Sequence, residues 1–215
     1  MKSDYTTDGP EATPASGPTT RRGRGKRASD TTIPRDRILH AAARLFHERG
    51  YQGTKVRDIA EAVGILSGSL FYHFRSKDEM LFEIMRETAL SLCLRAEDVV
   101  QRTGDPAARL QQIIDMELAW MVSDVKKDYL AVLVFEWREV PEPLKAEFTR
   151  LRTRYNGIWL DALSDYARLC PLRIPVDAAA HILHGALMGA MTWFRASGRY
   201  SAPEFRDMLL KLIVA

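Results

Sequence analysis

The sequence predicts an all-α fold with about nine helices, and three observations predict it. Apolar residues recur at spacings of three and four along nearly all of the chain after residue 34. Glycine, proline and capping residues divide this pattern into segments of helical length. No segment alternates apolar and polar residues as a half-buried strand would. With 215 residues, of which 46% are hydrophobic, the chain is long enough for one large helical domain or two smaller ones.

The first 33 residues do not share the helical pattern. Residues 1–33 are rich in Thr, Ser, Gly, Pro and charge, and they offer little to bury, so we expect a disordered basic tail. Within the tail, "RRGRGKR" places five cations in seven residues, from Arg21 to Arg27. Two interpretations stay open. The run is either a solvated basic segment or an arm that lies along DNA, where arginines flanked by glycine fit a narrow minor groove.

Residues 34–80 predict three short helices. The segment "RDRILHAAARLFHERG" places its apolar side chains on one face and ends at Gly50. Thr54 is in position to cap a second helix, "KVRDIAEAVG", which ends at Gly64. Ser67 is expected to cap a third helix, which runs to about Phe74 after a tight turn.

Residues 81–215 predict a second helical domain. "SKDE", which begins at Ser76, is a capping box for a fourth helix that reaches about residue 102. Asp105 and Pro106 form the cap and first position of a helix that reaches about residue 125. Further helical patterns cover about 129–137, 143–169 and 176–196, and "SAPE" caps a last helix that reaches the C-terminus.

The charge of the chain is unevenly distributed. The formal net charge is +3, yet the first 86 residues carry 15 Lys and Arg against 11 Asp and Glu. The remaining residues carry 16 against 17. A positive end joined to a nearly neutral body indicates an anionic partner that docks at one end.

Several classes of protein are disfavoured by what the sequence lacks. The two cysteines, Cys93 and Cys170, suit free thiols in a reducing cytosol better than disulfides or a metal site. There is no signal-like segment and no apolar run of membrane-spanning length, so we expect a cytoplasmic protein with no membrane partner. We find no paired carboxylates, nucleophile elbow, phosphate-binding loop or metal-spaced His and Cys, and therefore expect no catalytic residues, metal or cofactor. A helical enzyme stays as the less favoured alternative.

The segment "GILSGSLFYHFRSKDEM", which starts at Gly64, has the spacing of a helix-turn-helix. Such a unit lays its second helix in the DNA major groove. Small residues near the turn permit close approach, and periodicity turns Leu70 and Phe74 toward the core. Gly68 and Ser69 allow this approach to double-stranded DNA, and Ser67 and Ser69 can bond phosphates or base edges. Phe71 is left for a thymine methyl group, and Tyr72 and His73 for phosphates.

The longer segment "TKVRDIAEAVGILSGSLFYHFRSKDEML" resembles the DNA-binding signature of the TetR family of bacterial one-component regulators. The resemblance covers about residues 35–85 and departs at Phe71, where the family usually has tyrosine, although Tyr72 follows. It implies a ligand-responsive regulator, most often a repressor, that binds a palindromic operator as a dimer. It also implies phosphate contacts by Thr54, Tyr72, His73 and Lys77, and base or groove contacts by Leu66, Ser67, Gly68, Ser69 and Phe71.

Three of these residues have structural alternatives. Thr54 and Ser67 can be helix caps, and His73 can be a structural histidine. Lys77 falls in the first turn of a helix and can be an ordinary solvated charge, but the helix dipole disfavours a cation there, and this favours a phosphate contact.

The C-terminal domain carries large, soft side chains at helical spacing. Residue by residue, a plain core is the more common explanation. As a group they favour a cavity that accepts a small hydrophobic effector, lined by Met116, Trp120, Phe135, Trp159, His184, Leu187 and Met188.

A dimer interface is expected in the last two helices. Gly185 and Gly189 are four residues apart and permit close helix contact, and the other expected interface residues are Trp193, Leu209 and Leu212. The alternative for the glycines is a packing groove within one chain. The segment "LRTRY", from Leu151 to Tyr155, and Arg150 just before it, carry arginines that could meet the phosphates of an acyl-CoA effector. The helix-turn-helix segment also resembles that of the acyl-CoA-sensing subgroup. A protein that binds DNA without choosing a sequence stays as a third alternative.

Overall fold

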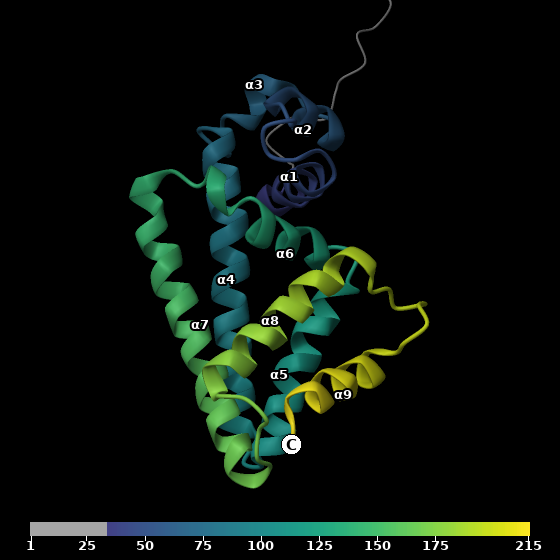
Figure 1. Ribbon diagram of the computed structural model, residues 1–215. Coiled ribbons are helices and arrows are strands. Elements are labelled where there is room, and N and C mark those ends of the chain that lie inside the picture. Colours follow the sequence, from purple (N-terminus) through teal and green to yellow (C-terminus); the bar gives the residue numbers. More distant parts are fainter. Residues whose placement is uncertain (1–33) are drawn as a thin grey trace, which may run out of the picture.

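The computed structural model describes residues 34–215, and these residues form nine α-helices and one short 3-10 helix (Figure 1). The prediction of an all-α chain with about nine helices is confirmed for this range. The helices are α1 Arg35–Arg49, α2 Val56–Val63, α3 Ser67–Leu70, α4 Lys77–Arg102, α5 Pro106–Met121, α6 Lys126–Phe135, η2 Trp137–Glu139, α7 Glu142–Leu169, α8 Val176–Trp193 and α9 Ala202–Ile213. The predictions for the basic tail concern residues 1–33, which lie outside the described range.

Three of the five predicted helix caps are found with their hydrogen bonds. The Ser76 side chain accepts a hydrogen bond from the backbone N–H of Glu79 at 3.1 Å, and the Asp105 side chain accepts one from Ala108 at 2.7 Å. Ser201 forms the predicted capping box at the start of α9. These starts were predictable because donor and acceptor are only three residues apart.

Two predicted caps are wrong by one residue. The cap of α2 is Lys55 rather than Thr54, and the Asp58 carboxylate accepts a hydrogen bond from the Lys55 N–H at 2.9 Å. The cap of α3 is Leu66, so Ser67 is the first helical residue. Helix α3 also ends at Leu70 rather than near Phe74, because the chain turns there into the approach to α4.

The first of two hydrophobic cores joins the N-terminal helices to the rest of the molecule. Its members from α1 to α3 include Ile38, Phe46, Ile59 and Leu70. The same cluster continues through Leu81, Ile84 and Met85 of α4, and it includes Val132 of α6 and Phe148 of α7. The three short helices are therefore held on a platform made by α4, α6 and α7.

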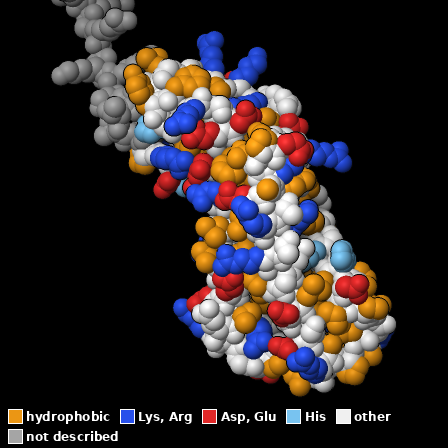
Figure 2. Space-filling view, turned by 90° about the vertical axis from the view of Figure 1, so that its left-hand side faces the viewer, with side chains coloured by type: hydrophobic (Ala, Val, Ile, Leu, Met, Phe, Trp, Pro, Cys, Tyr) orange, Lys and Arg blue, Asp and Glu red, His pale blue; other side chains and the backbone are white. Residues whose placement is uncertain are grey.

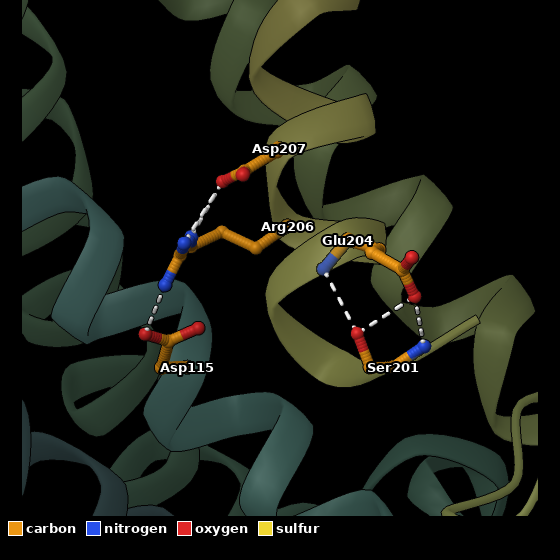
Figure 3. A network of polar contacts seen from close by, with 5 residues as sticks. All are labelled: Asp115, Ser201, Glu204, Arg206 and Asp207. Carbon is orange, nitrogen blue, oxygen red and sulfur yellow. Dashed lines mark hydrogen bonds and ion pairs between the residues drawn. The ribbon is translucent and has the colours of Figure 1, made fainter.

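The second core lies among α5, α7, α8 and α9, at the other end of α4 (Figure 1). Helix α4 has 26 residues and is about 39 Å long, so it spans the distance between the two cores. Helix α9 is fixed to α5 by Arg206, whose guanidinium forms ion pairs with Asp115 at 2.6 Å and with Asp207 at 2.9 Å (Figure 3). None of the helices within residues 34–215 is long and apolar enough to span a membrane.

Candidate DNA-binding surface and effector site

The turn between α2 and α3 depends on a glycine. Gly64 has a φ of 80°, in the left-handed region, and the backbone N–H of Ile65 donates to the Ala60 carbonyl at 3.0 Å. This is the hydrogen-bonding pattern of a glycine-terminated helix. A side chain at residue 64 would meet no steric obstacle, so the glycine is required by its backbone angle rather than by lack of space. The turn sets the angle at which α3 projects.

The segment around α3 exposes large side chains. Tyr72 is 86% exposed, and Leu66 and Phe71 are each more than half exposed, whereas Leu70 and Phe74 are buried as periodicity predicts. Gly68, between Leu66 and Phe71 in the sequence, is also exposed and has open space where a Cβ would be. Exposed apolar and aromatic groups on such a short segment are typical of a surface that meets a partner.

Two residues proposed to contact DNA are less accessible. Ser69 is largely buried, and its backbone carbonyl accepts a hydrogen bond from the Tyr72 N–H at 3.2 Å. His73 is half-buried, and its N–H donates to the Leu70 carbonyl at 3.0 Å. Their DNA contacts, like that of the half-buried Ser67, stay predictions.

Thr54 has an internal role. Its side chain is only 1% exposed, and its hydroxyl donates to the carbonyl oxygens of Leu45 at 3.1 Å and Gly50 at 2.9 Å. These carbonyls lie at the C-terminal end of α1, where backbone acceptors need partners. The side chain therefore has no surface from which to reach a phosphate, and the predicted phosphate contact is wrong for this conformation.

Lys77 also turns inward. Its Nζ donates to the carbonyl oxygens of Tyr51 at 2.8 Å and Thr54 at 2.9 Å, and it lies 4.0 Å from the centre of the Tyr51 ring. The Tyr51 hydroxyl in turn donates to Asp78, and burial together with this hydrogen bond raises the pKa of Tyr51. A cation in the first turn of α4 is thus explained by backbone carbonyls of the loop between α1 and α2, without a phosphate.

Other cations near α3 were missed by the sequence analysis. Lys55, Arg57 and Arg75 are exposed, and they form no ion pair with another residue of the described chain. Arg35 is occupied, because it pairs with Glu83 at 3.5 Å and stacks over a phenylalanine ring. Figure 2 shows Lys and Arg side chains projecting at the end of the molecule that carries α2 and α3. The sequence could have indicated Lys55, Arg57 and Arg75 as candidates for DNA contact, because they lie within or directly beside the helix-turn-helix segment.

The predicted effector residues do not all come together. Trp120, Trp159 and Leu187 lie in the second core, Met116 packs against it, and the His184 ring centre lies 4.6 Å from that of Trp159. Phe135 is 54% exposed where α6 ends, and Met188 is about half exposed on the outer side of α8, so their predicted inward positions are wrong. An open groove runs along the outer face of α4, but none of the predicted effector residues lines it.

A buried polar group in this core was not predicted from the sequence. The Tyr155 hydroxyl of α7 donates to the Glu117 carboxyl of α5 at 2.5 Å. Burial raises the pKa of Glu117 to about 7, against the lowering effect of the Tyr155 hydroxyl and the nearby Trp159 indole, and burial lowers the pKa of His184 to about 4. The burial of Glu117 could have been predicted from the helical spacing, because Glu117 lies four residues from both Ile113 and Met121 on the buried side of α5.

The glycines of α8 face outward. A Cβ added at Gly185 or Gly189 would have no heavy atom within 4 Å, which excludes the alternative of a packing groove within one chain. Trp193 and Leu212 are exposed as well. Leu209 is only 2% exposed and lies in the chain's own second core, so its predicted place in a dimer interface is wrong.

Two protein families match the chain. Residues 38–84 match the family described as "Bacterial regulatory proteins, tetR family", and residues 103–215 match the one described as "Tetracyclin repressor-like, C-terminal domain". The repressor KstR2 of Mycobacterium tuberculosis (strain ATCC 25618 / H37Rv) is 28% identical over 192 residues, covering 87% of this chain and 94% of KstR2. The repressor AcnR of Corynebacterium diphtheriae is 36% identical over 179 residues, covering 79% of this chain and 85% of AcnR.

Solved structures agree with these matches. The structure of the ketosteroid transcriptional regulator KstR2 of Mycobacterium tuberculosis is similar to this one with a TM-score of 0.75 at 27% identity, covering 86% of this chain and 96% of the other. AibR, solved with isovaleryl coenzyme A and operator DNA, has a TM-score of 0.73 at 22% identity, covering 83% and 96%, and it shows the fold alone. The helix-turn-helix, the helical body and both family matches agree, and the chain belongs to the TetR family of bacterial DNA-binding transcriptional regulators, which are not enzymes.

Proposed function

We propose that the chain is a ligand-responsive repressor that binds a palindromic operator as a homodimer and is released from it by a small hydrophobic or acyl-CoA effector. Family membership supports the DNA-binding and regulatory parts of this proposal, and both KstR2 and AcnR are named as repressors.

The observation that carries the proposal is the exposure of Tyr72, Phe71 and Leu66 around α3. In a helix-turn-helix this is the element that enters the major groove. We assign base and groove contacts to this face, which also includes Ser67 and Gly68. We assign phosphate contacts to Tyr72 and to the exposed cations Lys55, Arg57 and Arg75, because positively charged side chains and hydroxyl groups position a protein on the DNA backbone.

The outer face of α8 supports the proposed dimer. Gly185 and Gly189 carry no side chain and leave open space on this face. The neighbouring Ile182, Met188 and Trp193 have large, exposed apolar side chains. Small residues that allow close approach, with apolar groups around them, suit the same helix of a second copy, since homodimers commonly use one patch twice. With Leu212 of α9, this surface would set the distance between two α3 segments.

The link between effector and operator would run through α4 and α6. Helix α4 spans both cores, and His47 of α1 pairs with Asp128 of α6 at 2.7 Å. The Tyr51 N–H, in the loop after α1, also donates to Glu136 at 3.2 Å. An effector that moves α4 or α6 would therefore move the helix-turn-helix with it. The distance between the two α3 segments of a dimer would then no longer match the operator.

For the effector, a coenzyme A thioester is one of two proposed classes. AibR, which shares the fold, was solved with isovaleryl coenzyme A. In this chain, Arg154 pairs with Glu97 through two hydrogen bonds of 2.6 Å, and Arg152 stacks over the Trp137 ring. Arg150 and Arg152 are exposed and form no ion pair within the described residues, whereas Arg154 is paired with Glu97, so the acyl-CoA alternative has one phosphate partner fewer than the sequence alone indicated.

The proposal is tested by fluorescence anisotropy on a labelled fragment from upstream of the protein's own gene, with unlabelled bulk DNA as competitor. We expect the upstream fragment to be preferred at physiological salt, and Tyr72→Ala to weaken its binding at least tenfold. Tyr200→Ala is the matched control, because Tyr200 lies far from α3 along the chain, between α8 and α9. Equal competition by bulk DNA would support the sequence-indifferent alternative, and unchanged binding by Tyr72→Ala would refute the assigned surface.

A further inference from the structure

Four side chains from three helices form a polar cluster inside the otherwise apolar second core. Glu117 comes from α5, Tyr155 and Trp159 from α7, and His184 from α8. The His184 ring lies 4.6 Å from the Trp159 ring and 6.2 Å from the Tyr155 ring, measured between ring centres. Trp159 has no exposed surface and Glu117 is buried. Polar groups at such a depth need partners, because water does not supply them.

Not all the hydrogen-bonding groups of the cluster are satisfied. The Tyr155 hydroxyl donates to Oε1 of Glu117, and the other carboxyl oxygen accepts no hydrogen bond from the described residues. The Trp159 indole lies close enough to Glu117 to lower the pKa of that carboxyl, but its Nε1–H forms no hydrogen bond of normal geometry. Nε2 of His184 is also buried without a partner. The cluster therefore has an unused acceptor and an unused donor next to each other.

The charges around the cluster limit which polar group of a ligand can bind there. No Lys or Arg within the described residues forms an ion pair with Glu117 or changes its pKa. A carboxylate would thus meet another carboxyl group and no cation. An ammonium group would satisfy Glu117 but has no acceptor for the Trp159 Nε1–H. A hydroxyl group can do both, since it donates one hydrogen bond and accepts others.

We propose that the cluster of Glu117, Tyr155, Trp159 and His184 is the polar end of the effector site, and that it binds a neutral hydroxyl group of an otherwise apolar ligand. The ligand hydroxyl donates to the free oxygen of Glu117 and accepts from Nε1–H of Trp159. The imidazole of His184, which is neutral at physiological pH, supplies a second contact through Nε2. The apolar part of the ligand lies against the surrounding core, which includes Trp120 and Leu187. This inference rests on the proposed function, because it assumes that the helical body binds an effector.

The test uses three probes with the same apolar tail, namely octanol, octylamine and octanoate. Binding to the full-length protein is measured by quenching of tryptophan emission and by the shift of the melting temperature at pH 7.5. We expect octanol to bind more tightly than either charged probe. Trp159→Phe and Glu117→Gln should each weaken octanol binding about tenfold, which corresponds to one hydrogen bond to a buried group. Tyr200→Phe, in the segment between α8 and α9 and outside the cluster, is the matched control and should leave octanol binding unchanged.

Three results would overturn the inference: octylamine or octanoate bound as tightly as octanol, no probe bound at all, or the same octanol affinity in Trp159→Phe and Glu117→Gln as in the wild type. Operator binding is measured on the same samples. If operator binding is intact while the preference for octanol is absent, the inference fails and the proposed function stands. If the wild-type protein does not bind the upstream DNA, the proposed function itself fails.

Discussion

Replacing Lys77 separates a structural role from a role in DNA binding. The side chain connects the first turn of α4 to the loop after α1, through hydrogen bonds of 2.8 Å and 2.9 Å to two carbonyl oxygens and through the Tyr51 ring at 4.0 Å. We predict that Lys77→Met destabilises the folded protein but has little direct effect on phosphate contacts. Lys55→Met is the matched control, because Lys55 is exposed and has no ion pair among the described residues.

The size of the effect follows from these contacts. A hydrogen bond to a charged group contributes about 1.5 kcal/mol or more, and a cation over an aromatic ring at a partly exposed site adds about 0.5 kcal/mol. Lys77 is half-buried, so solvent screening reduces the total, and methionine keeps much of the packing of the aliphatic stem. We therefore expect the free energy of unfolding to fall by about 2 kcal/mol in Lys77→Met. In Lys55→Met it should change by less than about 0.5 kcal/mol.

Urea unfolding measures the free energy of unfolding, and it is done at one fixed protein concentration because the unfolding midpoint of a dimer depends on concentration. Anisotropy titrations of operator DNA at several salt concentrations measure the number of phosphate contacts. Lys55→Met should reduce the salt dependence by about one phosphate contact, and Lys77→Met, assayed under conditions where it is folded, should not. The reasoning is refuted if Lys77→Met unfolds at the wild-type urea concentration and loses a phosphate contact instead.

Three further predictions follow from single residues. Thr54→Val removes two internal hydrogen bonds and should lower the free energy of unfolding by about 1–2 kcal/mol while operator affinity, measured by anisotropy, stays within about twofold. Burial raises the pKa of Glu117 from 4.5 to about 7, so the stability that the protonated carboxyl confers is fully present below pH 4.5 and is lost as the pH rises through 7. Between pH 5 and 8 the wild type should therefore lose up to about 3 kcal/mol relative to Glu117→Gln in urea titrations, and parallel pH profiles would contradict this. Gly189→Trp fits the single chain, because the site is open, but should abolish the dimer in light scattering; a dimer of wild-type mass would show that α8 does not form the interface.

The sequence predicted the elements whose causes are local. The caps at Ser76, Asp105 and Ser201 and the stop at Gly64 all depend on residues within one helical turn, and the structure contains each of them. The inward direction of Leu70 was likewise set by helical periodicity. These parts could be predicted because the interacting atoms are close in the sequence.

Apart from the caps at Thr54 and Ser67, each misplaced by one residue, the errors concern partners that are distant in the sequence. The carbonyl groups that bind Lys77 lie 23 and 26 residues earlier, whereas the family resemblance and the helix dipole both pointed to a phosphate. Glu117 was not singled out from the sequence, because its hydrogen-bond partner Tyr155 is 38 residues away. Leu209 could not be assigned to its own core or to a second chain until the contact between α9 and α5 was known. Sequence periodicity gives the apolar side of a helix but not the neighbour that covers it.

Hydroxyl-radical footprinting of the wild-type protein on the DNA upstream of its own gene tests the central claim most directly. Two copies of α3 held by one dimer should protect two patches with related sequences, with centres about one helical turn or a small multiple of it apart. Those patches should disappear together in Tyr72→Ala. A single protected patch, or uniform weak protection along the whole fragment, would contradict a dimer that reads DNA through this surface.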